Sequence, residues 1–246
     1  KDDATDYLDR HKLGHIVSTY SDHVSFPIIL TDAEGVAHTL NEATAIWSRN
    51  KSDITDEQYQ EFYRHVAHSP EKPWAVLHNK AEGALEYTNL LFIPAIKPFD
   101  LFHPERRRRV KLYVKRVYIT DEVDLVPPYL RFLRGVVDSA DLPLNISRET
   151  LQKSPVLDTI RDSITNRILS ELKKRAEKEP EEYTKFWNNF GAAVKEGLCE
   201  SMAPREKILE CCMFNSTYSK AVTPSNDGVH LSSTESITDG SRRAPG

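Results

Sequence analysis

The sequence has little of what nucleotide-binding, disulfide-bonded or membrane proteins usually display. Its three cysteines, at positions 199, 211 and 212 of 246, form neither a disulfide framework nor a zinc motif. It contains no GxGxxG, GxxxxGK[ST], GxSxG or CxxC pattern, so it has no recognisable nucleotide cradle of its own. No apolar run approaches membrane-spanning length, and the opening KDDATDYLDR is too acidic for a secretory signal. We therefore expect a protein of the reducing cytoplasm with no membrane partner.

The composition is that of an ordinary globular protein. Hydrophobic residues make up 39% of the chain and charged residues 28%, and the length is sufficient to bury a sizeable core. The formal net charge of −4 argues against a general nucleic-acid binder, although it does not exclude a local basic patch. We expect one large folding unit and a smaller one.

Hydrophobic periodicity predicts an α/β fold. Strand patterns occupy residues 24–30, 36–40, 74–78, 85–94, 110–119 and 130–137. Helical patterns occupy residues 3–20, 56–66 (capped by Thr55), a long stretch from Ser154 onward, 181–196 and 204–213. From Asn215 the polar composition loses all periodicity and predicts disorder. The expected domains are a large α/β sandwich over residues 1–153, a helical coil over 154–213 and a truncated or disordered tail over 214–246.

The most informative stretch is residues 138–152, DSADLPLNISRETLQ. Pro143 holds the chain extended, and Ser147 is a plausible N-cap that places Arg148 in a first helical turn. A helix N-terminus that carries an arginine favours an anion, because free amides, the helix dipole and a guanidinium converge there. The alternative is an ordinary surface ion pair between Arg148 and Glu149 or another carboxylate.

Two tryptophans allow two interpretations each. Trp47, in the polar stretch AIWSRNKSD, either plugs the local core or is an exposed contact residue. Trp187 lies beside the apolar face of the helix at 181–196, which fits a residue at the edge of the core or a binding residue.

Two further patterns are weak functional signals. The arginines before the strand at 110–119 resemble a phosphate or RNA site, but such runs are usually solvated hairpin tips; they are Arg106, Arg107, Arg108 and Arg109. His11 and His15 lie one helical turn apart without a third ligand nearby, so we expect no metal there.

Several long segments together resemble a known family. The chain is similar to the middle segment of the heat-shock protein 90 chaperones, in the bacterial form that lacks a charged linker. The resemblance covers about residues 3–217 and rests on the segments IWSRNKSDIT, EYTNLLFIP, PFDLF, VKLYVKRVYITDE and LPLNISRETLQ.

The resemblance implies a role for individual residues. Arg148 matches the catalytic-loop arginine that reaches the γ-phosphate of ATP, and Asn145 and Gln152 match polar residues that flank it. Phe99 matches an apolar residue that supports the loop and the interdomain contact. Trp47 matches a residue implicated in client contact, and we place Trp187 in the same class.

The resemblance also implies partners and a cofactor. ATP, with Mg²⁺, would be bound by a separate N-terminal domain, so the isolated chain should be inactive. Unfolded or partly folded client proteins and co-chaperones would be the other partners, in a full-length homodimer of which this chain alone is monomeric. Residues after 217 and the pair Cys211-Cys212 depart from the family pattern. The alternative function is an RNA- or ribosome-associated module that uses the four arginines.

Overall fold

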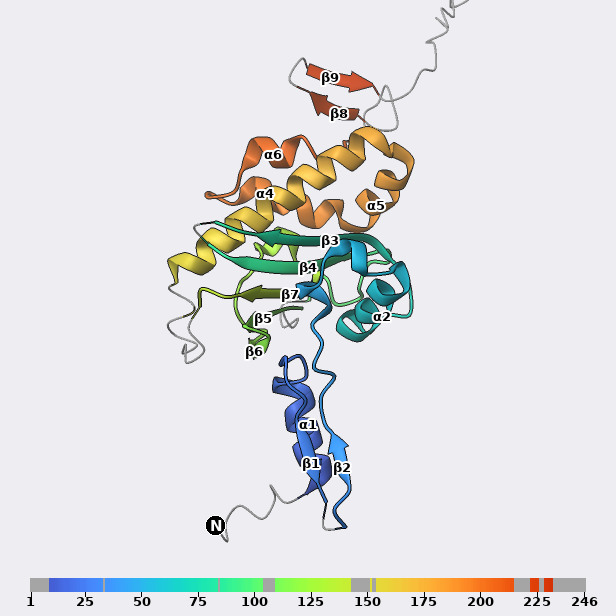
Figure 1. Ribbon diagram of the computed structural model, residues 1–246. Coiled ribbons are helices and arrows are strands. Elements are labelled where there is room, and N and C mark those ends of the chain that lie inside the picture. Colours follow the sequence, from blue (N-terminus) through green and yellow to red (C-terminus); the bar gives the residue numbers. More distant parts are fainter. Residues whose placement is uncertain are drawn as a thin grey trace, which may run out of the picture. The chain divides into compact units, whose positions relative to one another are not determined.

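The computed structural model describes residues 9–32, 34–83, 85–103, 109–142, 151, 154–214, 222–225 and 228–231 (Figure 1). The chain divides into two compact units, Lys1–Ile168 and Leu169–Gly246. The division falls inside helix α4 (Pro155–Lys178), whereas the domain boundary predicted from the sequence lies at the start of that helix. The mixed content of helices and sheet confirms the predicted α/β class.

The first unit is built on a five-stranded sheet in the order β3-β4-β7-β5-β6. All neighbouring pairs are antiparallel except β5 and β7, which run parallel. Consecutive side chains of a strand point to opposite faces of the sheet. In β4 the consecutive residues Leu90, Leu91, Phe92 and Ile93 are all fully buried, so both faces are covered there. The strands are β3 (Pro73–Ala81), β4 (Tyr87–Pro94), β5 (Val110–Val114), β6 (Val117–Thr120) and β7 (Arg134–Ser139).

Helix α2 (Asp56–Ala67) covers part of this sheet, close to the predicted helix at 56–66. Thr55 and Gln58 form a reciprocal capping box that satisfies free amides of the first turn. Tyr63 and Val66 then pack into one buried cluster with Trp47 and Phe92. Short 3-10 turns complete the connections; they are Ile46–Ser48, Lys51–Asp53, Pro128–Leu130 and Gly197–Cys199.

The single strand predicted at 110–119 is wrong, because the chain reverses within it. β5 and β6 form a tight hairpin whose two turn residues, Lys115 and Arg116, have φ values of 51° and 68°. Such left-handed turns usually require Asn or Gly, so the alternating pattern VKLYVKRVYI gave no sign of a turn. The Arg116 amide donates to the Asp138 carboxylate at 3.1 Å, a bond from β7 that helps to hold the turn.

The N-terminal segment contains helix α1 (Arg10–Tyr20) and a hairpin of β1 (Ile29–Thr31) and β2 (Ala37–Thr39). Asp9 caps α1 by accepting from the amides of His11 and Lys12, and residues 3–8 of the predicted helix lie outside the described residues. The buried amide of Asn41 bonds to backbone groups of Val24, Phe26 and Ile28, which fixes the segments on either side of the hairpin.

The second unit consists of the end of α4, then α5 (Pro180–Glu196) and the short α6 (Arg205–Leu209). The predicted apolar stripe of α5 is confirmed, since Tyr183, Phe186, Phe190 and Val194 are all buried. Cys211 and Cys212 are buried as well, and their thiols donate to the backbone carbonyls of Leu169 and Ile208. Burial raises the pKa of Cys211 to about 12 and that of Cys212 to about 11, so both remain protonated packing residues.

The structure describes eight residues of the segment for which the composition predicts disorder. β8 (Val222–Ser225) and β9 (Gly228–Leu231) pair as an antiparallel hairpin. The sequence Asn226-Asp227-Gly228, whose last residue begins β9, contains the hairpin-turn signal Asp-Gly within a polar, low-complexity composition. The rest of the predicted tail after Phe214 lies outside the described residues.

None of the helices in the described part of the chain combines the length and apolarity that a membrane span needs.

Candidate functional site

The three predicted catalytic residues, Asn145, Arg148 and Gln152, lie outside the described residues. The structure does describe both ends of the loop that carries them. The chain leaves the sheet at the end of β7, Leu142 is the last described residue before the gap, and the buried Leu151 lies between that gap and α4.

The incoming end of the loop is bonded to Glu86, directly before β4. The Ala140 amide and the Ser139 hydroxyl both donate to the Glu86 carbonyl, at 3.2 and 3.3 Å. The Glu86 amide donates in return to the Asp141 carboxylate at 2.6 Å. These reciprocal bonds continue the pairing of β4 and β7 beyond the ends of the two strands, and they fix where the loop begins.

The outgoing end is fixed by burial and by a bond to the neighbouring residue, Tyr87. The Leu151 side chain is only 2% exposed, and its carbonyl accepts from the Ser154 amide just before α4. The Tyr87 hydroxyl donates to the Ser163 hydroxyl of α4 at 2.7 Å. The consecutive residues Glu86 and Tyr87 therefore hold the two ends of the loop in place.

Asp138 was not identified from the sequence, yet it joins three segments at the base of this loop. Its carboxylate accepts from the Trp47 indole nitrogen at 2.9 Å and from the Arg116 amide at 3.1 Å. A signal was present, because Asp138 directly follows the buried apolar pair Val136 and Val137 within β7. Charged residues within such a strand are rarely buried without partners.

A polar cavity of about 300 Å³ lies at the same end of the sheet. Three cationic and two anionic side chains contribute to its lining, which is Ser25, Lys80, Ala81, Glu86, Tyr87, Thr88, Lys115, Arg116, Asp138 and Ala140. The cavity therefore joins the residues that anchor the loop with the β5–β6 turn.

Phe99 lies on a second loop and is the most exposed large apolar side chain of the described residues, at 101% of its reference area. The backbone around it is held firmly. Leu101 is 1% exposed, and its carbonyl accepts from the Arg131 guanidinium at 2.9 Å. Asp100 forms a 3.1 Å ion pair with Arg109. A rigid turn thus presents an apolar ring to solvent.

The two tryptophans differ in exposure. Trp47 is fully buried, its ring 4.8 Å from that of Tyr113, and its carbonyl accepts from the His78 imidazole. The structure thus favours the interpretation of Trp47 as a core plug over that of an exposed contact residue. Trp187 is half-buried, stacked on Tyr183 with Lys195 over its ring.

The weaker signals gain no support. Of the four arginines only Arg109 is described, and it is engaged with Asp100. His11 and His15 are both exposed on α1, and within the described ranges neither belongs to a group of potential metal ligands.

Comparison with known proteins gives a consistent result. A family model described as "Hsp90 protein" matches residues 31–230. "Chaperone protein HtpG" of Rickettsia canadensis (strain McKiel) is 59% identical over 218 residues, which cover 88% of this chain and 35% of that protein. The proteins of the same name from Rickettsia typhi (strain ATCC VR-144 / Wilmington) and Orientia tsutsugamushi (strain Boryong) are 60% and 57% identical, over 86% and 88% of this chain. The chain spans about a third of the length of these curated relatives.

Proposed function

The chain belongs to the heat-shock protein 90 family of chaperones, and we propose that it is the middle segment of an ATP-dependent member. In this proposal Arg148 reaches the γ-phosphate of ATP held by a separate N-terminal domain, and exposed apolar surface contacts client proteins. The observation that carries the proposal is the fixed base of the loop, with Glu86 bonded to its incoming end and Tyr87 to the helix at its outgoing end.

A fixed base suits an arginine that acts on another domain. Charge develops on the transferring phosphoryl group, and a guanidinium stabilises it best when its position is settled before the reaction. The loop ends are fixed by a β-ladder and by α4, so little movement of the base accompanies the meeting of the domains. Asn145 and Gln152 are proposed to orient the arginine from within the loop.

The sequence supports the division of labour between domains. It contains no phosphate-binding glycine motif, and ATP dependence is a general feature of the family. ATP and its Mg²⁺ would therefore be held mainly by the N-terminal domain, and domain closure would gate hydrolysis.

Exposed aromatic residues supply the contact surfaces. Phe99 is proposed to contact the N-terminal domain, because its ring is free on a backbone turn that Arg131 and Arg109 hold. Trp187 is proposed as a client contact, since it is only half-buried on α5. Trp47 is fully buried, so we assign it to the support of Asp138 rather than to direct client contact.

The test is reconstitution in trans. The chain is added to an isolated N-terminal ATPase domain of this family, and ATP hydrolysis is measured with wild-type chain, Arg148→Ala and Arg148→Lys. We expect stimulation by the wild type, none by the alanine variant and little by the lysine variant, because an ammonium cannot replace the planar guanidinium fork.

Arg205→Ala is the matched control, since Arg205 is an exposed arginine on α6 and its removal should leave stimulation unchanged. Equal stimulation by Arg148→Ala and wild type would remove Arg148 from the mechanism. No described contact favours the RNA-binding alternative, so we do not propose it.

A further inference from the structure

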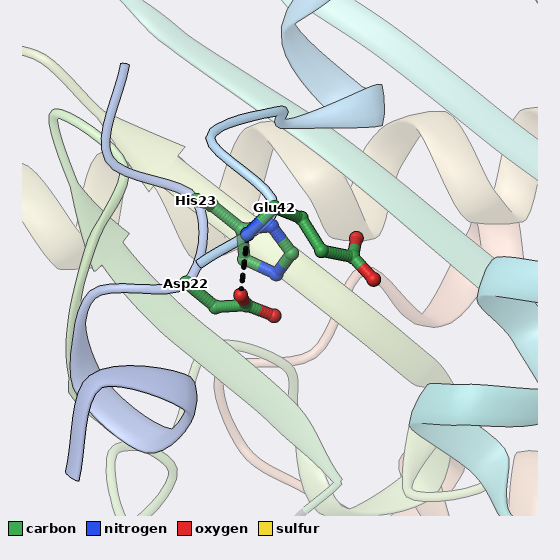
Figure 2. A group of neighbouring side chains, drawn as sticks. All are labelled: Asp22, His23 and Glu42. Atoms are coloured by element: carbon green, nitrogen blue, oxygen red, sulfur yellow. Dashed lines mark hydrogen bonds between the residues drawn. The ribbon is translucent and has the colours of Figure 1, made fainter. Parts of the chain in front are cut away.

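Three potential metal ligands that are not among the loop's anchoring residues converge in the segments that flank the β1–β2 hairpin (Figure 2). Asp22 and His23 follow α1, and Glu42 follows β2. The donor atoms of the three side chains all lie within 4.8 Å of one another. Neither the family match nor the proposed ATP chemistry gives this group a role.

One ring nitrogen of His23 forms a hydrogen bond to the backbone, and the other is available to a ligand. Its Nδ1 lies 2.7 Å from the Thr44 carbonyl, and because a carbonyl only accepts, Nδ1 carries the hydrogen. Nε2 has no hydrogen-bond partner in the part of the chain that the structure describes, although the residue is only 9% exposed. A metal-bound histidine typically donates its outer N–H to a backbone carbonyl in this way.

The protonation state of His23 suits a ligand. The Thr44 carbonyl fixes the tautomer, because Nδ1 must carry the hydrogen that this carbonyl accepts. A neutral imidazole with its hydrogen on Nδ1 presents a lone pair at Nε2, which is the form that coordinates metals.

The backbone around the group is already organised. The Asp22 carboxylate accepts from the Glu42 amide at 2.9 Å, and the Asp22 carbonyl accepts from the Ala43 amide at 3.0 Å. Ala43 has φ of 54°, an uncommon conformation for alanine that brings the two segments together. The exposed Glu42 side chain is then free to rotate toward a metal and close the ligand set.

We propose that Asp22, His23 and Glu42 bind a divalent transition-metal ion of the Zn²⁺ type. One imidazole nitrogen and two carboxylate oxygens are ligands that Zn²⁺ accepts, and three protein ligands leave a fourth position for water. Oxygen-only ions such as Mg²⁺ are disfavoured because a nitrogen donor is central to the group. The ion would cross-link the segment after α1 to the segment that leads to Trp47, whose ring lies 4.6 Å from the His23 ring.

The first test is Zn²⁺ titration of the whole chain by calorimetry in a non-chelating buffer. We expect one site, weakened at least about tenfold by Asp22→Asn and by Glu42→Gln. Glu42→Gln is the safer variant because the position is exposed, and Glu61→Gln, at an exposed glutamate of α2, is the matched control that should bind as the wild type does. No binding, or equal binding by all variants, would overturn the proposal.

A second measurement separates this site from the cysteines and from the His11–His15 pair. Nitrogen-15 NMR of the imidazoles should show that Zn²⁺ shifts His23 Nε2 and leaves its Nδ1 protonated. With Co²⁺ as the probe, a thiolate-to-metal absorption band would indicate a cysteine site instead. Loss of binding in a His11→Asn variant would equally contradict the assignment.

Discussion

At the residue scale, Trp47 stabilises the first unit in two ways, through the packing of its ring and through the hydrogen bond of its N–H. The ring is fully buried among aromatic neighbours, and Nε1 donates to the Asp138 carboxylate, which also holds the Arg116 amide. The residue thus connects the packing of the first unit to the base of the loop that carries Arg148. Its effect on loop function would be indirect, through Asp138.

Two substitutions of Trp47 should separate these contributions. Trp47→Ala should lower the free energy of unfolding by about 3–5 kcal/mol, because it leaves a large cavity. Trp47→Phe keeps a ring but removes one donor to a carboxylate, and should cost about 1–3 kcal/mol. Urea unfolding measures both. Ready iodide quenching of Trp47 fluorescence, in a background that carries both Trp74→Phe and Trp187→Phe, would contradict the buried position.

His78 gives the stability of the first unit a pH dependence. It is buried between the Tyr59 hydroxyl and the Trp47 carbonyl, and burial lowers the pKa of His78 below its usual 6.5. The unfolded chain therefore binds a proton more readily than the folded chain, so this contribution to stability is complete above about pH 6.5 and is lost as the pH falls toward the folded pKa.

Replacement of His78 should reduce that pH dependence. His78→Gln can still donate to the Trp47 carbonyl but cannot titrate, so the free energy of unfolding should fall less between about pH 7.5 and about pH 5.5 than in the wild type. His11→Asn, at an exposed position of α1, should retain the wild-type slope. An unchanged slope in His78→Gln would assign the pH dependence to other groups.

The β5–β6 turn shows, at the element scale, how one local conformation can depend on another strand. Lys115 and Arg116 both adopt left-handed backbone conformations without the help of glycine or asparagine. The Asp138 carboxylate of β7 offsets the cost of this conformation by accepting a hydrogen bond from the Arg116 amide. The strain lies next to the anchored base of the loop, where tertiary contacts are dense.

Relief of that strain should stabilise the protein. Arg116→Gly should raise the free energy of unfolding by about 0.5–1 kcal/mol, since glycine adopts positive φ without a steric penalty. Lys111→Gly, inside β5, is the matched control and should be destabilising because glycine weakens a strand interior. Urea midpoints measure both. A destabilising Arg116→Gly would mean that the side-chain bond from Arg116 to Ser25 outweighs the strain.

Elements with a strong local signal could be predicted from the sequence. The capping residues Thr55 and Gln58 mark the start of α2, and the apolar stripe from Leu157 to Leu172 gives α4. The β5–β6 turn could not be predicted, because its conformation depends on Asp138, which is distant in sequence. The β8–β9 hairpin lies in a segment whose polar composition predicts disorder, although the sequence Asn226-Asp227-Gly228 is a local hairpin signal.

The candidate site was also predictable only in part, because contacts between residues distant in sequence leave no local signal. The resemblance of LPLNISRETLQ pointed to Arg148, but nothing local revealed that Glu86 and Asp138 hold the base of that loop. Such bonds join residues far apart in the chain and arise only when the sheet pairs. The exposure of Phe99 and the burial of Trp47 likewise depend on what the finished fold covers.

At the scale of the whole molecule, the proposed function depends on a surface that would meet another domain. Phe99 is the proposed contact, and its full exposure means that the fold gains nothing from its ring. Phe99→Ala should therefore change the free energy of unfolding by no more than about 0.5 kcal/mol. The same variant should weaken the stimulation of an isolated N-terminal ATPase domain, because apolar area that is covered on docking is lost.

The loss should appear mainly as a higher concentration of chain needed for half-maximal stimulation, since Phe99 is proposed to act in docking and Arg148 in turnover. Phe26→Ala is the matched control, because Phe26 is a 74% exposed phenylalanine of the same unit, before β1. Equal loss in both variants would indicate general apolar contact rather than a defined interface. An unaffected Phe99→Ala, with Arg148→Ala still inactive, would separate the interdomain contact from the loop and place the docking surface elsewhere in the first unit.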